Sequence, residues 1–183
     1  MSAIHPVTQY ALDAIENKIV VGRSERLACL RHLHDLARAG QLSKDLAARV
    51  RKSTKEKIPS RDKKFPWMFD EAQASFVAIE WFGHLRHVEG KIAGQKIVLI
   101  PAHVFDVGCI FGWTARKKTI TRLDGRKVGL CRFTKALTTE GRKNAKTTRI
   151  AGIALYMLVG DREENPAIYT AAYDKKQARV CFN

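Results

Sequence analysis

The sequence predicts an α/β fold, in which an N-terminal helical region precedes an incomplete core of strand, phosphate loop, helix and strand. Three observations lead to this prediction. Apolar residues recur at helical spacing through the first half of the chain, extended apolar runs appear in the second half, and a basic loop separates one such run from an apolar helix. The composition, 45% hydrophobic and 28% charged, is typical of a folded globular chain.

Helices are expected throughout the N-terminal region. The apolar spacing of residues 7–15 after Pro6 predicts a short amphipathic helix. A second helix is expected to begin with Ser24 as its N-cap and to end at Gly40. That second helix is expected to bury Leu27, Leu30, Leu33 and either Leu36 or Ala37. A weaker third helix follows over residues 42–50.

The segment 49–64 holds eight basic and two acidic residues and is expected to be a linker or exposed arm, so residues 1–64 form the first part of the chain. Residues 65–96 are expected to be a connecting aromatic helix. Its aromatic stripe is expected to form core or an interface, and it consists of Phe69, Ala72, Phe76 and Ile79, continued by Trp81, Phe82 and Leu85. The third part, residues 97–183, opens with an extended apolar run that leads into a helix ending near Phe111.

Extended runs dominate the last part. Asp124-Gly125 is a favourable turn between two such runs and predicts a hairpin over residues 119–133. Residues 135–139 are expected to form a short strand, residues 149–159 an apolar helix, and residues 167–172 a second strand. Together these three elements would make a right-handed βαβ unit.

The loop between that strand and helix is the most informative segment. In a strand–loop–helix context, main-chain N–H groups would cradle phosphates, Lys146 would reach the β and γ phosphates, and Thr147 would bind Mg²⁺. The match to the Walker A pattern of a P-loop NTPase is incomplete, because Glu140 and Ala145 stand at its glycine positions. From the pattern alone, a basic strand-to-helix turn without nucleotide is an equal alternative.

These residues resemble the start of the ATPase motor in the large terminase subunit of tailed bacteriophages. The resemblance is most specific over residues 141–148 and 168–172, and weaker similarity extends over nearly the whole chain. The family loop commonly reads R-K-N-G-K-[ST], with an arginine four residues before the lysine. Arg142 and Lys146 have that separation.

The resemblance implies ATP and Mg²⁺ as ligands. Arg142 and Lys146 would be the catalytic residues, and Thr147 would hold the metal. His103 stands where the family has a glutamine that contacts adenine. The remaining cofactor-binding residues implied are Gly141, Lys143, Asn144, Ala145 and Thr148.

The implied function is that of an ATP-driven DNA-packaging motor, a hydrolase that acts with double-stranded DNA, a small terminase subunit and the portal ring. No run ending in adjacent acids follows residue 172 to organise Mg²⁺ and water, and no nuclease carboxylate cluster is visible. The expectation is therefore an N-terminal fragment, or a truncated prophage gene, without catalytic competence of its own. Four dispersed cysteines and the lack of a bilayer-length apolar run indicate the cytoplasm of the bacterial host and no membrane.

Charge supports a second hypothesis. The net charge is +15, and twelve basic residues against two acidic ones lie between Arg116 and Arg149. Clustered Lys and Arg favour a polyanionic partner, because phosphate contacts release counterions. The alternative function is thus a basic module that binds the DNA backbone, or a decayed prophage remnant without nucleotide function.

Overall fold

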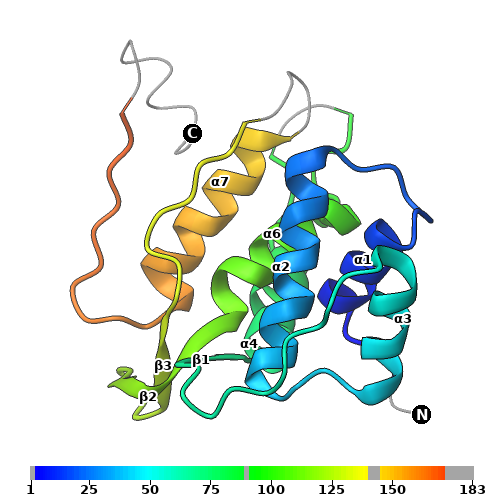
Figure 1. Cartoon of the computed structure of the whole chain (residues 1–183). Coiled ribbons are helices and arrows are strands. Elements are labelled where there is room, and N and C mark those ends of the chain that lie inside the picture. Colours follow the sequence, from blue (N-terminus) through cyan, green and yellow to red (C-terminus); the bar gives the residue numbers. More distant parts are fainter. Residues whose placement is uncertain (1–2, 89–90, 140–144, 172–183) are drawn as a thin grey trace.

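The computed structural model describes residues 3–88, 91–139 and 145–171, in which helices pack around a small antiparallel sheet (Figure 1). The helices are α1 (Pro6–Ile15), α2 (Arg23–Ala39), α3 (Lys44–Thr54), α4 (Glu71–Ser75), α5 (Phe82–His84), α6 (Pro101–Gly112) and α7 (Lys146–Leu155). Two π-helical segments, η1 (Phe76–Trp81) and η2 (Tyr156–Gly160), continue α4 and α7. The strands are β1 (Trp67–Phe69), β2 (Trp113–Thr121) and β3 (Lys127–Cys131).

The predicted N-terminal helices are confirmed, with one end moved. The His5 side chain accepts a hydrogen bond from the Val7 N–H and caps α1. Helix α2 begins at Arg23 with Gly22 as the N-cap, so Ser24 lies inside the helix rather than at its cap. It ends as predicted at Gly40, whose φ of 75° is the left-handed conformation that glycine adopts without strain. Leu27 is 56% exposed, so its predicted burial is wrong.

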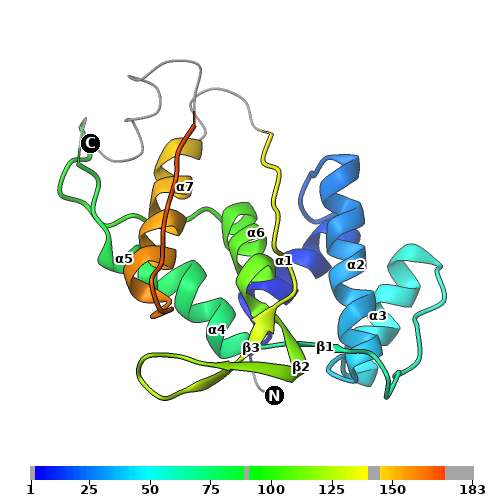
Figure 2. The same ribbon diagram turned by 90° about the vertical axis from the view of Figure 1, so that its left-hand side faces the viewer.

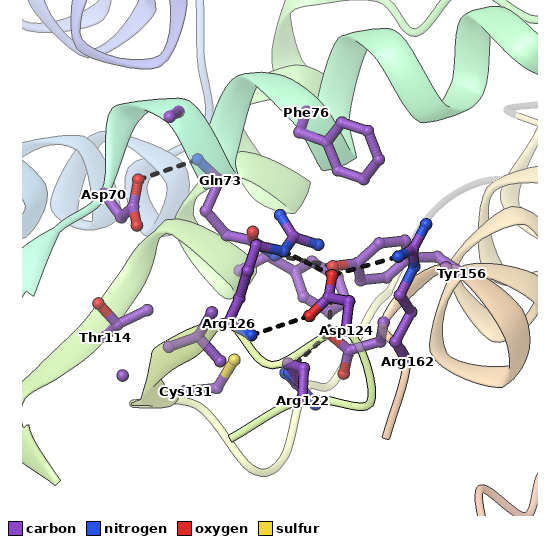
Figure 3. A pocket seen from close by; sticks show the side chains of 16 residues that line it. Asp70, Gln73, Phe76, Thr114, Arg122, Asp124, Arg126, Cys131, Tyr156 and Arg162 are labelled. Atoms are coloured by element: carbon purple, nitrogen blue, oxygen red, sulfur yellow. Dashed lines mark hydrogen bonds and ion pairs between the residues drawn. The ribbon is translucent and has the colours of Figure 1, made fainter. Parts of the chain in front are cut away.

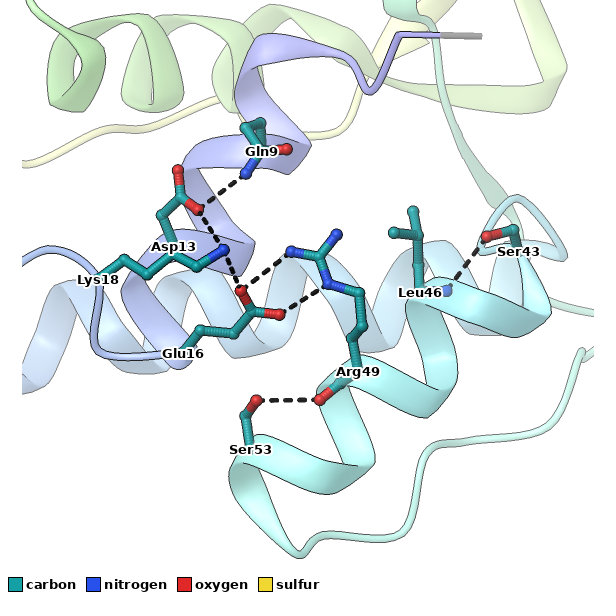
Figure 4. A network of polar contacts seen from close by, with 8 residues as sticks. All are labelled: Gln9, Asp13, Glu16, Lys18, Ser43, Leu46, Arg49 and Ser53. Atoms are coloured by element: carbon teal, nitrogen blue, oxygen red, sulfur yellow. Dashed lines mark hydrogen bonds and ion pairs between the residues drawn. The ribbon is translucent and has the colours of Figure 1, made fainter. Parts of the chain in front are cut away.

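A polar network joins α1 to α3 (Figure 4). Arg49 on α3 donates two hydrogen bonds to Glu16, at 2.7 and 3.0 Å, and Lys18 lies 2.7 Å from the same carboxylate. These hydrogen bonds lower the pKa of Glu16 to about 2. Arg49 is therefore part of a helix, and the irregular part of the predicted linker begins after Thr54.

The predicted aromatic stripe is buried only in part. Phe69 is buried, but it lies on β1, while Phe76 and Ile79 are 37% and 44% exposed. In the helical stretch from α4 to α5, Phe82 is buried as predicted, and the other buried residues are Ala74, Val77 and Ala78. A π-helical turn holds more residues than an α-helical turn, so η1 rotates the following side chains out of the expected phase.

The predicted hairpin is confirmed, and it belongs to a sheet in the order β1–β2–β3 with both pairs antiparallel. Strand β2 begins at Trp113, earlier than predicted, and pairs with β1 through Phe69 opposite Trp113. Gly125 takes a φ of 80° at the hairpin turn.

The predicted parallel βαβ unit is not formed in the described part of the chain. Helix α7 is present and begins at Lys146, but residues 135–139 and 167–171 carry no strand. A parallel strand needs a neighbouring strand for its backbone hydrogen bonds, and the described sheet consists of β1, β2 and β3, all paired antiparallel. The fold is thus a mixture of helices and a three-stranded antiparallel sheet.

Helix α6 lies at the centre, between α2 and α7 in both views (Figures 1 and 2). Its Phe105 belongs to the core formed with α1, α2, α3 and the sheet residues Phe69 and Trp113. Its Val107 and Phe111 belong to a second core with η1, α5 and Tyr156 of η2. No helix in the described ranges has the length and apolarity needed to cross a membrane.

Candidate functional site

Two cavities in the described part of the chain matter here, and the larger one, of about 1280 Å³, lies between α2, α6, α7 and the chain segments 97–100 and 133–139. Figure 2 shows the segment 133–139 rising from β3 between these helices. Three of the residues predicted to bind nucleotide line this cavity, namely His103, Ala145 and Thr148. His103 comes from the first turn of α6 and the other two from the start of α7, so tertiary folding brings them to one place.

The other predicted site residues fall into two groups. Lys146 and Thr147 are the first two residues of α7, directly beside the lining residues; Lys146 is partly buried and Thr147 is exposed. Gly141, Arg142, Lys143 and Asn144 lie outside the described residues.

Ala145 has an unusual backbone. It is the N-cap of α7 with φ 51° and ψ 24°, in the left-handed region that favours glycine. The family loop has glycine at this position, so the conformation fits the resemblance. The Arg149 N–H donates to the Ala145 carbonyl at 3.0 Å, which is the first bond of the helix. The N–H groups of the three residues between them therefore have no acceptor within α7 and point toward the loop side.

Arg149 is a buried basic residue in the wall of the larger cavity. It lines the cavity and is only 3% exposed. Its Nη1 donates to Asp106 Oδ2 of α6 at 3.1 Å. Burial raises the pKa of Asp106, and the nearby Glu25 adds to that rise, while Arg149 opposes it.

The N-terminal helix α2 supplies a wall of the cavity that sequence reasoning missed. Ser24, Glu25, Arg31 and His32 all line it. No spacing in the sequence could have revealed them, because α2 lies about seventy residues before α6 along the chain. Asp106 did leave a signal, because it is an acidic residue within the otherwise largely apolar sequence of α6.

His32 has a structural role behind this wall. The Trp113 indole N–H donates to its Nδ1 at 3.1 Å, and its Nε2 lies 3.2 Å from the Thr8 hydroxyl. The rings of Phe69, Phe105 and Trp113 meet it edge to face. Burial lowers the pKa of His32 to about 3, so the imidazole is neutral. In the described ranges, no three His, Cys, Asp or Glu side chains gather in a way that could hold a metal ion.

A smaller cavity, of about 650 Å³, lies between the β2–β3 hairpin, α4 and η2 (Figure 3). Its charges neutralise one another. Arg122 is buried and pairs with Asp161 at 2.7 Å and with Glu163 at 2.6 Å. Asp124 pairs with Arg126 at 2.6 Å and Arg162 at 3.2 Å. None of the predicted site residues lines this cavity, and its ion pairs fasten the hairpin to the end of η2.

The basic stretch is only partly available to a partner. Arg116 donates to the main-chain carbonyls of Ala39 and Trp67, and Arg132 pairs with buried Asp35 at 2.7 Å. Arg122, Arg126 and Arg149 are ion-paired as described above. The lysines of the hairpin are exposed, namely Lys117, Lys118 and Lys127.

An α/β chain whose basic helix start opens on its larger cavity is consistent with a partial NTPase-like domain. Residues 101–183 match the family model of the terminase large subunit, ATPase domain. This match confirms the resemblance seen in the sequence and makes residues 101–183 similar to a component of a DNA-packaging motor. The match begins at Pro101, the first residue of α6. Neither the curated proteins nor the solved structures contain a match.

Proposed function

We propose that this chain binds Mg-ATP in the larger cavity, as the nucleotide-binding part of an ATP-driven DNA-packaging motor. The observation that carries the proposal is that His103, Ala145 and Thr148 line one cavity. Its volume of about 1280 Å³ leaves room for a nucleoside triphosphate. The start of α7 forms part of its wall, and helix N-termini favour phosphate.

The chain's own residues would divide the work. Lys146 would neutralise the β and γ phosphates, and the first N–H groups of α7 would hold their oxygens. Thr147 would hold Mg²⁺, and His103 would lie against the base. Arg142 would contact phosphate from the loop, whose other members are Gly141, Lys143 and Asn144.

Binding without turnover is the expected behaviour of these residues alone. Phosphoryl transfer needs a carboxylate that positions water and metal. The carboxylates that line the cavity in the described part are Glu25 and Asp106. Glu25 accepts a hydrogen bond from Tyr10, and Asp106 is paired with Arg149, so both are engaged elsewhere.

Isothermal titration calorimetry of the full chain with Mg-ATP tests the proposal. Wild type should bind, and Lys146→Ala should lose binding by about tenfold or more, because a charge-assisted contact to phosphate disappears. Lys118→Ala is the matched control, since it removes the same charge from the exposed hairpin. Equal affinity of Lys146→Ala and wild type would count against the proposal.

Double-stranded DNA is proposed as a second ligand, at the hairpin. Lys117, Lys118 and Lys127 are exposed there, whereas five arginines of the same basic stretch are engaged within the protein. Removing these three lysines should weaken DNA binding and flatten its dependence on salt concentration. Lys146→Ala should leave DNA affinity largely intact. DNA binding without any Mg-ATP binding would favour a basic DNA-binding module over the motor.

The proposed partners, cellular location and domain bounds rest on similarity to the terminase family alone. A small terminase subunit and the portal ring are the proposed partners, in the cytoplasm of a bacterial host. Residues 1–64 would be the N-terminal helical region, 65–96 the connection, and 97–183 the beginning of the ATPase domain.

A further inference from the structure

Arg149 sits where it can reach a ligand bound at the start of α7. It is the fourth residue of this helix, counted from Lys146. Helical side chains lean toward the N-terminus of their helix, so the guanidinium is directed back toward the loop. Its burial and its place in the cavity wall set it apart from the exposed lysines of the basic stretch.

Asp106, the carboxylate that Arg149 contacts on α6, is a weaker anion than a triphosphate. Asp106 is 47% exposed at its side chain, although its arginine is buried. Its carboxylate is still partly desolvated, and this desolvation and the neighbouring Glu25 both raise the pKa of Asp106, although Arg149 opposes the rise. A phosphate group offers more charge and several oxygens, and the flat guanidinium can bind two of them at once.

We propose that Arg149 is a specificity-determining residue that contacts the phosphates of the bound nucleotide, and that Asp106 holds it in place until the nucleotide arrives. This inference rests on the proposed function, because it needs a nucleotide in the larger cavity. It adds to that function a residue outside the loop and a competition between Asp106 and the ligand. The competition couples nucleotide binding to α6, which carries Asp106.

A purely structural role is the competing explanation, in which the ion pair only fastens α7 to α6. The two explanations differ in the effect of removing Asp106. If the ion pair only fastens α7 to α6, removing Asp106 weakens that contact, and nucleotide affinity stays the same or falls. If Asp106 competes with the nucleotide for Arg149, removing Asp106 raises nucleotide affinity.

The experiment is calorimetry of the full-length variants with Mg-ATP and with AMP, alongside thermal unfolding. Arg149→Gln should weaken Mg-ATP binding by about tenfold or more, with AMP affected much less because it lacks the β and γ phosphates. Asp106→Asn should strengthen Mg-ATP binding by about threefold or more. The matched controls are Arg126→Gln and Asp124→Asn, which break an ion pair of the same type in the hairpin.

Each outcome decides. Opposite shifts in Mg-ATP affinity from Arg149→Gln and Asp106→Asn support the inference. Unchanged affinity of Arg149→Gln, or unchanged or weaker affinity of an Asp106→Asn variant that still folds, overturns it. If Arg149→Gln does not fold, Asp106→Asn and the milder Arg149→Lys serve as the test. Arg149→Lys should bind Mg-ATP less tightly than wild type, because an ammonium group cannot bind two phosphate oxygens at once as a guanidinium does. Wild type that does not bind Mg-ATP overturns the proposed function and this inference together. Wild type that binds, with loss in Lys146→Ala but no change in Arg149→Gln, overturns this inference alone.

Discussion

Acid should destabilise this protein through His32. The imidazole is neutral in the fold, with a pKa of about 3, whereas in the unfolded chain it titrates near 6.5. Between pH 6.5 and pH 3 the unfolded chain binds a proton at His32 and the folded protein does not. The contribution of His32 to the free energy of unfolding is therefore complete above pH 6.5 and falls as the pH drops toward 3.

The magnitude follows from those two values. Each pH unit between them costs about 1.4 kcal/mol, so lowering the pH from about 7.5 to about 5 should cost about 2 kcal/mol from His32 alone. Urea unfolding at both pH values measures it, with His32→Asn as the comparison. The asparagine Oδ1 can still accept the Trp113 N–H that His32 Nδ1 accepts, but the amide does not titrate.

His32→Asn should be less stable at neutral pH, because ring contacts with Phe69, Phe105 and Trp113 are lost. Its further loss between the two pH values should be smaller than that of wild type by about 2 kcal/mol. His5 and His34 titrate in both proteins and therefore cancel in the comparison. Equal losses in the two proteins would refute the assignment of acid sensitivity to His32.

Three further predictions concern stability. Ala145→Gly should raise the free energy of unfolding by about 1 kcal/mol in urea, because glycine adopts the left-handed conformation without strain; an unchanged or lower value would contradict this. Asp35→Ala should lower the free energy of unfolding by about 3 kcal/mol, since buried Asp35 neutralises Arg132. A loss below about 1 kcal/mol would show that the fold does not depend on the Asp35–Arg132 ion pair. Gly152→Ala should lower the melting temperature, at a cost of about 2 kcal/mol, because the added methyl would collide with the Phe82 ring; a variant as stable as wild type would show that the ring moves aside.

Local patterns in the sequence were sufficient to predict the helices and the hairpin. The capping geometry of α1, the end of α2 at Gly40 and the turn at Asp124-Gly125 depend on neighbouring residues only. The buried face of residues 71–84 was not predictable in this way. The π-helical segment η1 changes the period of the helix, and η1 packs against η2, where the Trp81 and Tyr156 rings lie 5.6 Å apart.

The site was half predictable for the same reason. The motif around Lys146 and the position of His103 are sequence features, and folding placed His103 beside Ala145 and Thr148. Two predicted strands failed because a strand requires a partner as well as an apolar run. The wall contributed by α2, and the pairing of Arg149 with Asp106, depend on contacts between segments far apart in the chain.

The packing of Trp113 and Phe105 on His32 has a practical consequence for any exchange of segments between this chain and similar proteins. A graft that starts at Pro101, where the family match begins, would lack the His32 ring on which Phe105 and Trp113 pack. It would also leave the Trp113 indole N–H without its acceptor. The exchangeable piece therefore has to start upstream of Thr8, so that α1 and α2 travel with the helix they support.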